Sequence, residues 1–293
     1  MNCLYPYSVS EDVIVPCCKC LACRVNHAQE WSMRIMHELP YWDYATFLTL
    51  TYDDDHLPSD FSVHKKDLQL FFKRLRINLS RAGFDSDIRY FSAGEYGDKS
   101  ARPHYHSIIF GLDNCNDNHK EIVMTSWNNC QWDRFQDDLV FGTVTEDSSL
   151  YVASYVHKKY FGNYQKEIYQ NNGLEPPFQL QSQGIGKRYA LSQVRRLRND
   201  PYCYYKDKRI RAPRYYLKQV FPELQNYKWF GDDNAISKRL ELQELSKIKQ
   251  EEYEFRLFER SKIMKVNPWI LQHEQAVQKN LDLKFFQKSR DFS

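Results

Sequence analysis

The sequence has no run of about 18 apolar residues, so no membrane-spanning helix is predicted. Residues 1–10 contain neither the basic nor the apolar segment of a signal peptide, and we therefore expect the chain to work in the cytoplasm. Internal repeats are absent, and so is the G-x-x-x-x-G-K-[ST] loop with which many ATPases hold phosphate. Eight cysteines in 293 residues are too few for a disulfide scaffold.

The composition is typical of one or two folded domains. Apolar residues make up 42% of the chain and charged residues 27%, a balance found in globular proteins. The 41 Lys and Arg residues nearly match the 38 Asp and Glu residues, whereas 21 tyrosines are many for an ordinary domain. Residues 187–218 stand out, because they hold eleven Lys and Arg against two Asp and are interleaved with six Tyr.

The cysteines are concentrated near the N-terminus. Cys3, Cys17, Cys20 and Cys23 would supply the four thiolates of a structural Zn²⁺ site, with Cys18 as a substitute ligand. In a reducing cytoplasm such a cluster favours metal binding over disulfides. Free thiols or an iron–sulfur cluster are the alternatives, because two overlapping C-x₂-C spacings differ from the separate pairs of an ordinary zinc ribbon.

Hydrophobic periodicity predicts an α+β fold with a central antiparallel sheet, packed helices and a helical C-terminal extension. Strands are expected at residues 46–52, 88–97, 104–110 and 140–144. Helices are expected at residues 25–40, 63–82, 119–135, 149–160 and 234–265, the fourth capped by Asp147, Ser148 or Ser149. Residues 162–186 are rich in Gln, Asn, Gly and Pro, and a loop is expected there.

One candidate site combines two histidines with a carboxylate. His104 and His106 share one face of their strand, since side chains at i and i+2 point the same way. Glu95 ends the preceding strand, and an antiparallel pairing would bring it beside the histidines. Two imidazoles and one carboxylate suit a divalent cation with open positions for water and substrate oxygens. The alternative is a pair of hydrogen-bonded histidines and a surface carboxylate.

A second candidate site consists of Tyr151, Tyr155 and Lys158. The two tyrosines lie one helical turn apart, and Lys158 falls on an adjacent part of the same face. A phenol of pKa ~10 is a weak nucleophile unless a cation or a base assists it. Lys158, or Lys159 in its place, would give that assistance. Core packing is the alternative explanation for two tyrosines at helical spacing.

The basic, tyrosine-rich stretch has the composition of a nucleic-acid surface. Cations pair with phosphates, and aromatic rings stack on bases. Arg209, Arg211 and Arg214 are the expected contacts. The alternative is a solvated basic face that balances the acidic remainder of the chain.

The order and spacing of these motifs resemble a known superfamily. His104-Tyr105-His106, preceded by Phe47–Thr51 and followed by the tyrosine pair, is similar to the HUH endonucleases that initiate rolling-circle replication. A closer resemblance, over about residues 1–220, is to the replication initiators of gokushovirus-type microviruses. That similarity is carried by the segments Val15–Arg24, Thr49–Pro58, Gly94–Gly97, Arg102–His106, Gly184–Gly186 and Pro213–Tyr216.

The resemblance implies an enzyme that nicks and rejoins single-stranded phage DNA at the origin. His104, His106 and Glu95 would hold Mg²⁺ or Mn²⁺, and one of Tyr151 and Tyr155 would form a 5′-phosphotyrosine intermediate. Lys158 would position or help to ionise the phenols. The partners implied are origin DNA, a host helicase and the host DNA polymerase, in the bacterial cytoplasm.

The same resemblance implies a division of the chain into four parts. These are a Cys-rich segment and helix at residues 1–40, a catalytic core at 41–186, a DNA-contacting segment at 187–220 and a helical extension at 221–293.

Three other functions fit parts of the pattern. A non-catalytic, zinc-containing nucleic-acid-binding protein would explain the cysteines and the basic stretch but not the histidine and tyrosine motifs. A metal-dependent phosphodiesterase would use water as its nucleophile and need neither tyrosine. A relaxase usually carries its tyrosine before the histidine motif, whereas here the tyrosines follow it.

Overall fold

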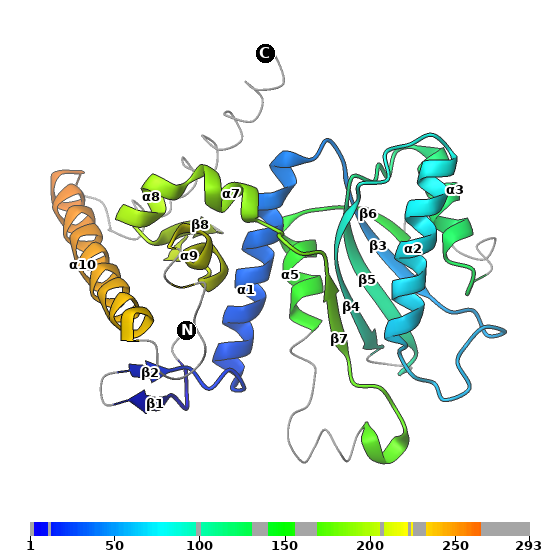
Figure 1. The fold of residues 1–293 in the computed structure, drawn as a ribbon, viewed down its shortest axis with the longest axis horizontal. Helices are drawn as coiled ribbons and strands as arrows, with labels where there is room; N and C mark the ends of the chain where they lie inside the picture. The colour runs from blue at the N-terminus through cyan, green and yellow to red at the C-terminus, as the bar shows by residue number, and fades with distance from the viewer. Residues whose placement is uncertain are drawn as a thin grey trace. The chain divides into compact units, whose positions relative to one another are not determined.

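The computed structural model describes residues 3–10, 13–97, 101–130, 140–155, 169–205, 208–221, 224 and 233–264. The chain divides into two compact units, Met1–Ile185 and Gly186–Ser293. The first unit contains the central sheet, and the second contains most of the basic stretch and the long C-terminal helix (Figure 1).

A five-stranded antiparallel sheet forms the centre of the first unit, in the order β6-β3-β5-β4-β7. Its strands are β3 (Ala45–Thr51), β4 (Arg89–Tyr96), β5 (Pro103–Phe110), β6 (Phe141–Thr143) and β7 (Phe178–Gln181). Strands β3 and β4 flank β5 and pair with it along its length, which places the histidine strand in the middle of the sheet. The predicted α+β fold with a central antiparallel sheet is thus confirmed.

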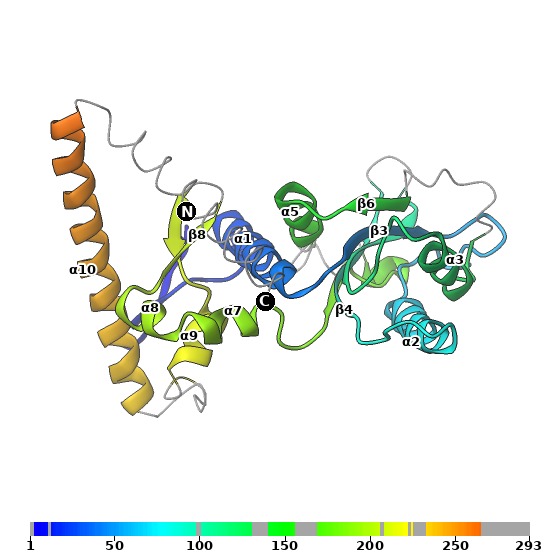
Figure 2. The same ribbon diagram turned by 90° about the horizontal axis from the view of Figure 1, so that it is seen from above.

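Helices cover both faces of this sheet (Figures 1 and 2). On one face lie α2 (Lys65–Arg81) and α3 (Asp117–Ser126), whose apolar residues pack on Leu48, Leu50 and Tyr105. On the other face lie α1 (Leu21–Glu38) and α5 (Glu146–Ser154), which pack on Ile108 and Phe110. Because side chains alternate along a strand, Tyr105 faces one helical layer while His104 and His106 face the other.

Local sequence explains why these helices form where they do. In α2 the buried side chains recur every three or four residues, which gives one apolar face against the sheet. In α5 the Thr145 hydroxyl accepts the backbone N–H of Ser148, while the Ser148 hydroxyl accepts that of Thr145. This capping box satisfies helix donors that would otherwise lack an intrahelical partner.

Three local expectations were wrong. Residues 178–181, expected in a loop, form the edge strand β7, which pairs with β4. The helix expected at 119–135 ends as α3 at Ser126, and Thr145 rather than residues 147–149 caps α5. The expected continuation of that helix through residues 156–160 lies outside the described residues. The two-residue alternation of β7 is weak because it is a half-buried edge strand.

The remaining elements of the first unit are short. They comprise β1 (Tyr7–Ser10), β2 (Val13–Val15), η1 (Leu39–Tyr41) and η4 (Gln170–Asn172). Strands β1 and β2 form an antiparallel hairpin that precedes α1.

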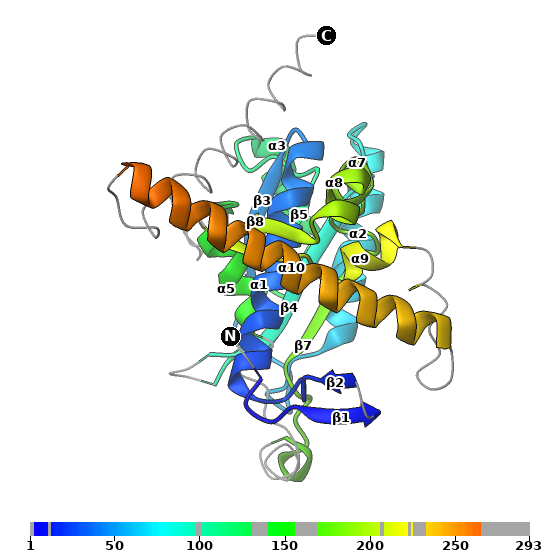
Figure 3. The same cartoon turned by 90° about the vertical axis from the view of Figure 1, so that its left-hand side faces the viewer.

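The second unit combines short elements with one long helix. Its elements are α7 (Lys187–Ser192), α8 (Val194–Asn199), β8 (Tyr202–Tyr205), β9 (Lys208–Arg211), α9 (Arg214–Val220) and α10 (Asp233–Met264). Figure 3 shows α10 as a single long helix, which agrees with the expected helix at residues 234–265. Within the described part of the chain, no helix has the length and apolar character that crossing a membrane requires.

Candidate metal and tyrosine site

Glu95, His104 and His106 meet on one face of the sheet. The antiparallel register of β4 and β5 puts Glu95 directly opposite His104. Glu95 Oε1 lies 2.9 Å from His104 Nε2 and 3.4 Å from His106 Nε2. The carboxylate is only 2% exposed. The pairing expected from the sequence is therefore present, and its three ligand atoms lie within 4.8 Å of one another.

The opposite nitrogen of each imidazole is held by the surrounding backbone and side chains. His104 Nδ1 lies 3.0 Å from the Arg102 carbonyl, so Nδ1 carries the proton and Nε2 faces Glu95. His106 Nδ1 lies 3.1 Å from the Thr49 hydroxyl. Such outer contacts fix the ring orientation of metal-binding histidines. Both Nε2 atoms are thus aimed at one point beside Glu95.

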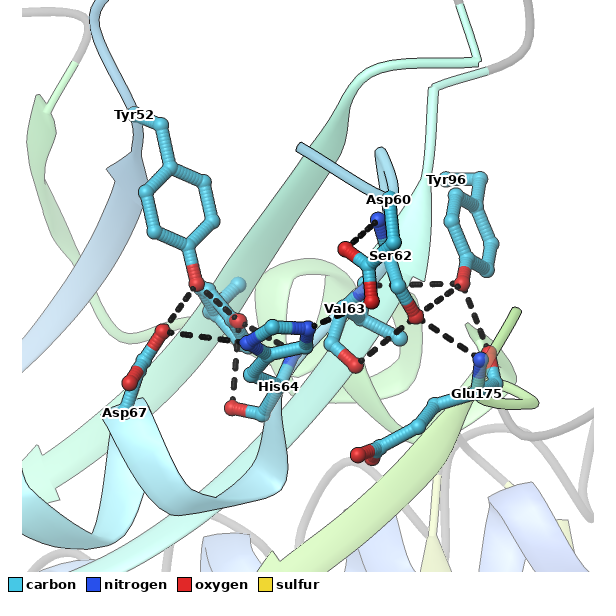
Figure 4. Close-up of polar contacts among 9 residues, drawn as sticks. Tyr52, Asp60, Ser62, Val63, His64, Asp67, Tyr96 and Glu175 are labelled. Carbon is cyan, nitrogen blue, oxygen red and sulfur yellow. Dashed lines mark hydrogen bonds and ion pairs between the residues drawn. The ribbon is translucent and has the colours of Figure 1, made fainter. Parts of the chain in front are cut away.

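The other face of β5 is fixed by a buried network of hydroxyl groups. The Tyr105 hydroxyl lies 2.6 Å from that of Tyr52 and accepts the backbone N–H of His64 at 2.8 Å. The Tyr52 hydroxyl donates to Asp67 at 2.8 Å (Figure 4). These bonds anchor the residue between the two histidines to α2 and to the loop before it.

A second group of contacts in Figure 4 anchors the end of β4. The Tyr96 hydroxyl accepts the backbone N–H of Val63 at 3.2 Å and donates to the Glu175 carbonyl at 2.7 Å. The Ser62 hydroxyl accepts the backbone N–H of Glu175 at 2.7 Å. Tyr96 follows Glu95 directly, so the carboxylate stands on a strand that is held from its far side.

Both tyrosines of the second motif lie against His106. The ring of Tyr155 stacks on that of His106 with centroids 4.7 Å apart and an angle of 7°. The ring of Tyr151 contacts His106 edge-on at 5.2 Å and Tyr155 at 4.6 Å. The structure therefore joins the two candidate sites, which lie far apart in the sequence, into one cluster.

The two phenols differ in exposure. Tyr151 is 47% exposed, whereas Tyr155 is 3% exposed. Burial raises the pKa of Tyr155 far above its usual value, and the neighbouring Tyr151 hydroxyl and Glu95 carboxylate raise it further. Tyr155 is consequently neutral in this environment, while Tyr151 faces solvent.

Packing between α1 and α5 positions the tyrosines. Val152 and Ala153, between the two tyrosines, are buried with Ala28 and Trp31 of α1. The hydroxyls of Ser32 and Ser149 are hydrogen-bonded across the same helix pair. Tyr151 is thus held on the outer side of a helix whose inner side is fixed.

Other predicted site residues have different fates. Lys158, and with it Lys159, lies outside the described residues. Arg211 and Arg214 are exposed. The side chain of Arg209 is 2% exposed, pairs with Asp200 and lies over the ring of Tyr202.

Arg209 is therefore a core residue of the second unit, which corrects its expected role in DNA contact. The charge of a strand residue in the sequence did not reveal that an acidic partner and two aromatic rings would enclose it. Tyr253 of α10 supplies the second ring, 4.7 Å from the guanidinium.

The four N-terminal cysteines also come together. The sulfur atoms of Cys3, Cys17, Cys20 and Cys23 lie within 4.8 Å of one another. Cys18 is exposed, and its sulfur lies near the Pro16 carbonyl instead.

Comparison with known proteins places the chain among phage replication proteins. The family model described as replication-associated protein ORF2 matches residues 45–160, which include both motifs of the site. Replication-associated protein VP4 of Bdellovibrio phage phiMH2K is 44% identical over 154 residues, 49% of this chain and 48% of that protein. Replication-associated protein ORF2 of Spiroplasma virus 4 is 32% identical over 232 residues, 72% of this chain and 69% of that protein.

The chain belongs to the family of phage replication-associated proteins. A third member, replication-associated protein ORF4 of Chlamydia phage 1, is 26% identical over 77% of this chain and 59% of its own length. The chain thus spans about half the length of the Bdellovibrio phage protein and more of the other two. No solved structure matches it. The resemblance seen in the sequence is confirmed at the level of the family.

Thr49 is a site residue of this family member that the sequence motifs did not indicate. Its register partner is His106, so its hydroxyl and the imidazole share one face of adjacent strands. The alternation of β3 contained this signal, because Phe47, Thr49 and Thr51 occupy the face opposite to Leu48 and Leu50. Only the pairing of β3 with β5 shows which histidine the threonine meets.

Proposed function

We propose that this replication-associated protein is an endonuclease that nicks and rejoins single-stranded phage DNA at the replication origin through a tyrosine. The observation that supports it most strongly is the contact of Tyr151 and Tyr155 with His106 of the Glu95/His104/His106 cluster. A nucleophile and a candidate cation site must be adjacent if both are to act on one phosphate.

The residues of the cluster fit a hard or borderline divalent cation. One carboxylate and two imidazole nitrogens, with no cysteine among them, suit Mg²⁺ or Mn²⁺ in a site with open positions. A bound cation there would polarise the scissile phosphate and offset the charge that develops on its oxygens. Glu95 and the two histidines supply the ligand atoms, and Thr49 and the Arg102 carbonyl keep the imidazoles oriented.

Tyr151 is the residue that we assign to the first cleavage. Its oxygen attacks the phosphorus, a Tyr–O–P bond forms, and the bond between phosphorus and the 3′ oxygen breaks. The phenol proton is released, and the departing 3′ oxygen takes up a proton to become a free hydroxyl. The 5′-phosphotyrosine conserves the energy of the broken bond, so rejoining needs no ATP. Its exposure makes Tyr151 reachable for DNA, whereas Tyr155 is covered.

Tyr155 would act in the second cleavage, after one round of synthesis. The free 3′-hydroxyl then attacks the first phosphotyrosine and closes the circle. Tyr155 can reach DNA only after a rearrangement of the stack on His106, which sets the order of the two events. Lys158 would position the phenols, as the family resemblance implies.

The remaining proposals concern partners. Arg211 and Arg214 are exposed cations suited to phosphate contacts. A host helicase and the host polymerase would separate the strands and extend the 3′-hydroxyl in the bacterial cytoplasm.

A covalent-adduct assay tests the proposal. The full chain is mixed with single-stranded origin DNA and Mn²⁺ or Mg²⁺ and run on a denaturing gel. We expect a metal-dependent protein–DNA band that Tyr151→Phe abolishes, that Tyr155→Phe retains in the first cleavage, and that Glu95→Gln reduces at least about 100-fold.

Each other outcome contradicts a specific part of the proposal. Cleavage without an adduct would indicate hydrolysis by water. DNA binding without cleavage would favour the non-catalytic function. Loss of the first adduct in Tyr155→Phe but not in Tyr151→Phe would reverse the assigned order.

A further inference from the structure

The N-terminal cysteine cluster has the dimensions of a tetrahedral metal site. Cys3 Sγ lies 3.8 Å from Cys20 Sγ, and Cys17 Sγ lies 4.0 Å from Cys23 Sγ. Four sulfurs at about 2.3 Å from a central Zn²⁺ would be about 3.8 Å apart along each edge of the tetrahedron. A disulfide would need about 2.05 Å, so these thiols are not paired with one another.

Backbone amides point at the sulfurs, as they do around metal-bound thiolates. Cys17 donates its N–H to Cys3 Sγ at 3.2 Å, and Cys20 donates its N–H to Cys17 Sγ at 3.3 Å. The Leu4 N–H reaches Cys20 Sγ at 3.5 Å. Such donors stabilise the charged form of the thiol and orient the ligands.

The turn between the ligands is shaped to bring them together. Cys18 has φ of 58°, in the left-handed region, which folds the segment back so that the Cys20 amide meets Cys17. The side chain of Cys18 is thereby directed outward and is exposed. Cys23 lies in the first turn of α1, so this helix carries the fourth sulfur into the cluster.

We infer that Cys3, Cys17, Cys20 and Cys23 bind one structural Zn²⁺. Four sulfur ligands leave no open position, so this site differs in kind from the Glu95/His104/His106 cluster. A cluster of several irons is disfavoured, because irons and bridging sulfides between the cysteines would hold their sulfurs farther apart than about 4 Å.

The site has a clear mechanical consequence for the first unit. Cys3 precedes the β1–β2 hairpin and the other three ligands follow it, so one ion closes the hairpin onto the beginning of α1 (Figures 1 and 3). The same helix packs on α5 through Ala28 and Trp31. Zinc therefore stabilises the helix against which the tyrosine helix rests.

The metal content of the full chain, purified under reducing conditions, tests the inference. We expect one zinc per chain in the wild type and in the controls Cys18→Ser and Cys115→Ser, whose cysteines are exposed. Cys20→Ser and Cys23→Ser should lose it. His104→Ala/His106→Ala should keep it, which separates this site from the histidine cluster.

Two measurements on the wild type keep the test decisive if the cysteine variants do not fold. Co²⁺ exchanged into the protein should show the intense visible bands and sulfur-to-cobalt charge transfer of tetrahedral thiolate coordination. Removal of zinc with a strong chelator should lower the Tm by roughly 10 °C. Protein without zinc that fails to bind Co²⁺, bound iron in place of zinc, or zinc retained by Cys20→Ser would each overturn the inference.

Discussion

The ring of Tyr155 lies flat on the ring of His106, with centroids 4.7 Å apart and 7° between the planes. Tyr155 is thus part of the packing beneath the site as well as a candidate nucleophile. Tyr155→Phe keeps the stacked ring and should change the free energy of unfolding by less than about 1.5 kcal/mol. Tyr155→Ala should lower it by about 3–5 kcal/mol because it leaves a cavity. Urea unfolding of both variants measures this, and equal losses would contradict the packing role.

Thr49 should tune metal binding without touching the metal. Thr49→Val keeps the shape of the side chain but removes the hydroxyl that meets His106 Nδ1. We expect Mn²⁺ affinity, measured by calorimetry, to fall about 10- to 100-fold. Thr49→Ser retains a hydroxyl and is the matched control. An unchanged affinity in Thr49→Val would show that the imidazole is oriented by its other neighbours.

Gly94 allows the edge strand β7 to lie close to β4. A Cβ at this position would come within 2.9 Å of the Phe178 ring and 3.1 Å of Tyr105. Gly94→Ala should therefore destabilise the protein by about 1–3 kcal/mol. The cost should shrink in a Phe178→Ala background, because the clashing ring is gone. Equal costs in both backgrounds would show that Phe178 is not the cause.

Alkaline pH should destabilise the protein through Tyr52 and Tyr105. Burial raises the pKa of both phenols above the usual value, so the folded state keeps them protonated. Below pH ~10 both states are neutral and this contribution is complete; above it, only the unfolded chain loses protons. The free energy of unfolding should then fall by about 1.4 kcal/mol per pH unit for each phenol.

Urea unfolding between about pH 9 and pH 11 measures this slope. Tyr52→Phe should remove one phenol's share of it. A slope that is unchanged in Tyr52→Phe would assign the effect to other groups.

Arg209 and Arg214 should separate folding from DNA binding. Arg209→Ala breaks the pairing with Asp200 and the stacking on Tyr202, so it should lower stability by about 2–4 kcal/mol. Arg214→Ala should leave stability within about 0.5 kcal/mol and weaken DNA binding, with a salt dependence reduced by about one phosphate contact. If Arg214→Ala binds single-stranded DNA as tightly as the wild type, Arg214 is not a contact.

Much of this protein was determined by sequence alone. The alternation in Phe47–Thr51 and Pro103–Phe110 predicted the strands, and the i, i+2 spacing put His104 and His106 on one face, because strand geometry leaves little choice. The short link after Glu95 predicted its pairing with the histidine strand. Overlapping cysteine spacings left zinc, free thiols and an iron–sulfur cluster open.

Tertiary structure alone decided how these pieces meet. No local pattern shows that α5 lays Tyr155 flat on His106, because that contact joins segments paired only through α1 and the sheet. The same holds for Arg209, whose charge suggested a surface until Asp200, Tyr202 and Tyr253 enclosed it. Edge strand β7 formed where composition indicated a loop, because a half-buried strand takes its stability from the neighbour it pairs with.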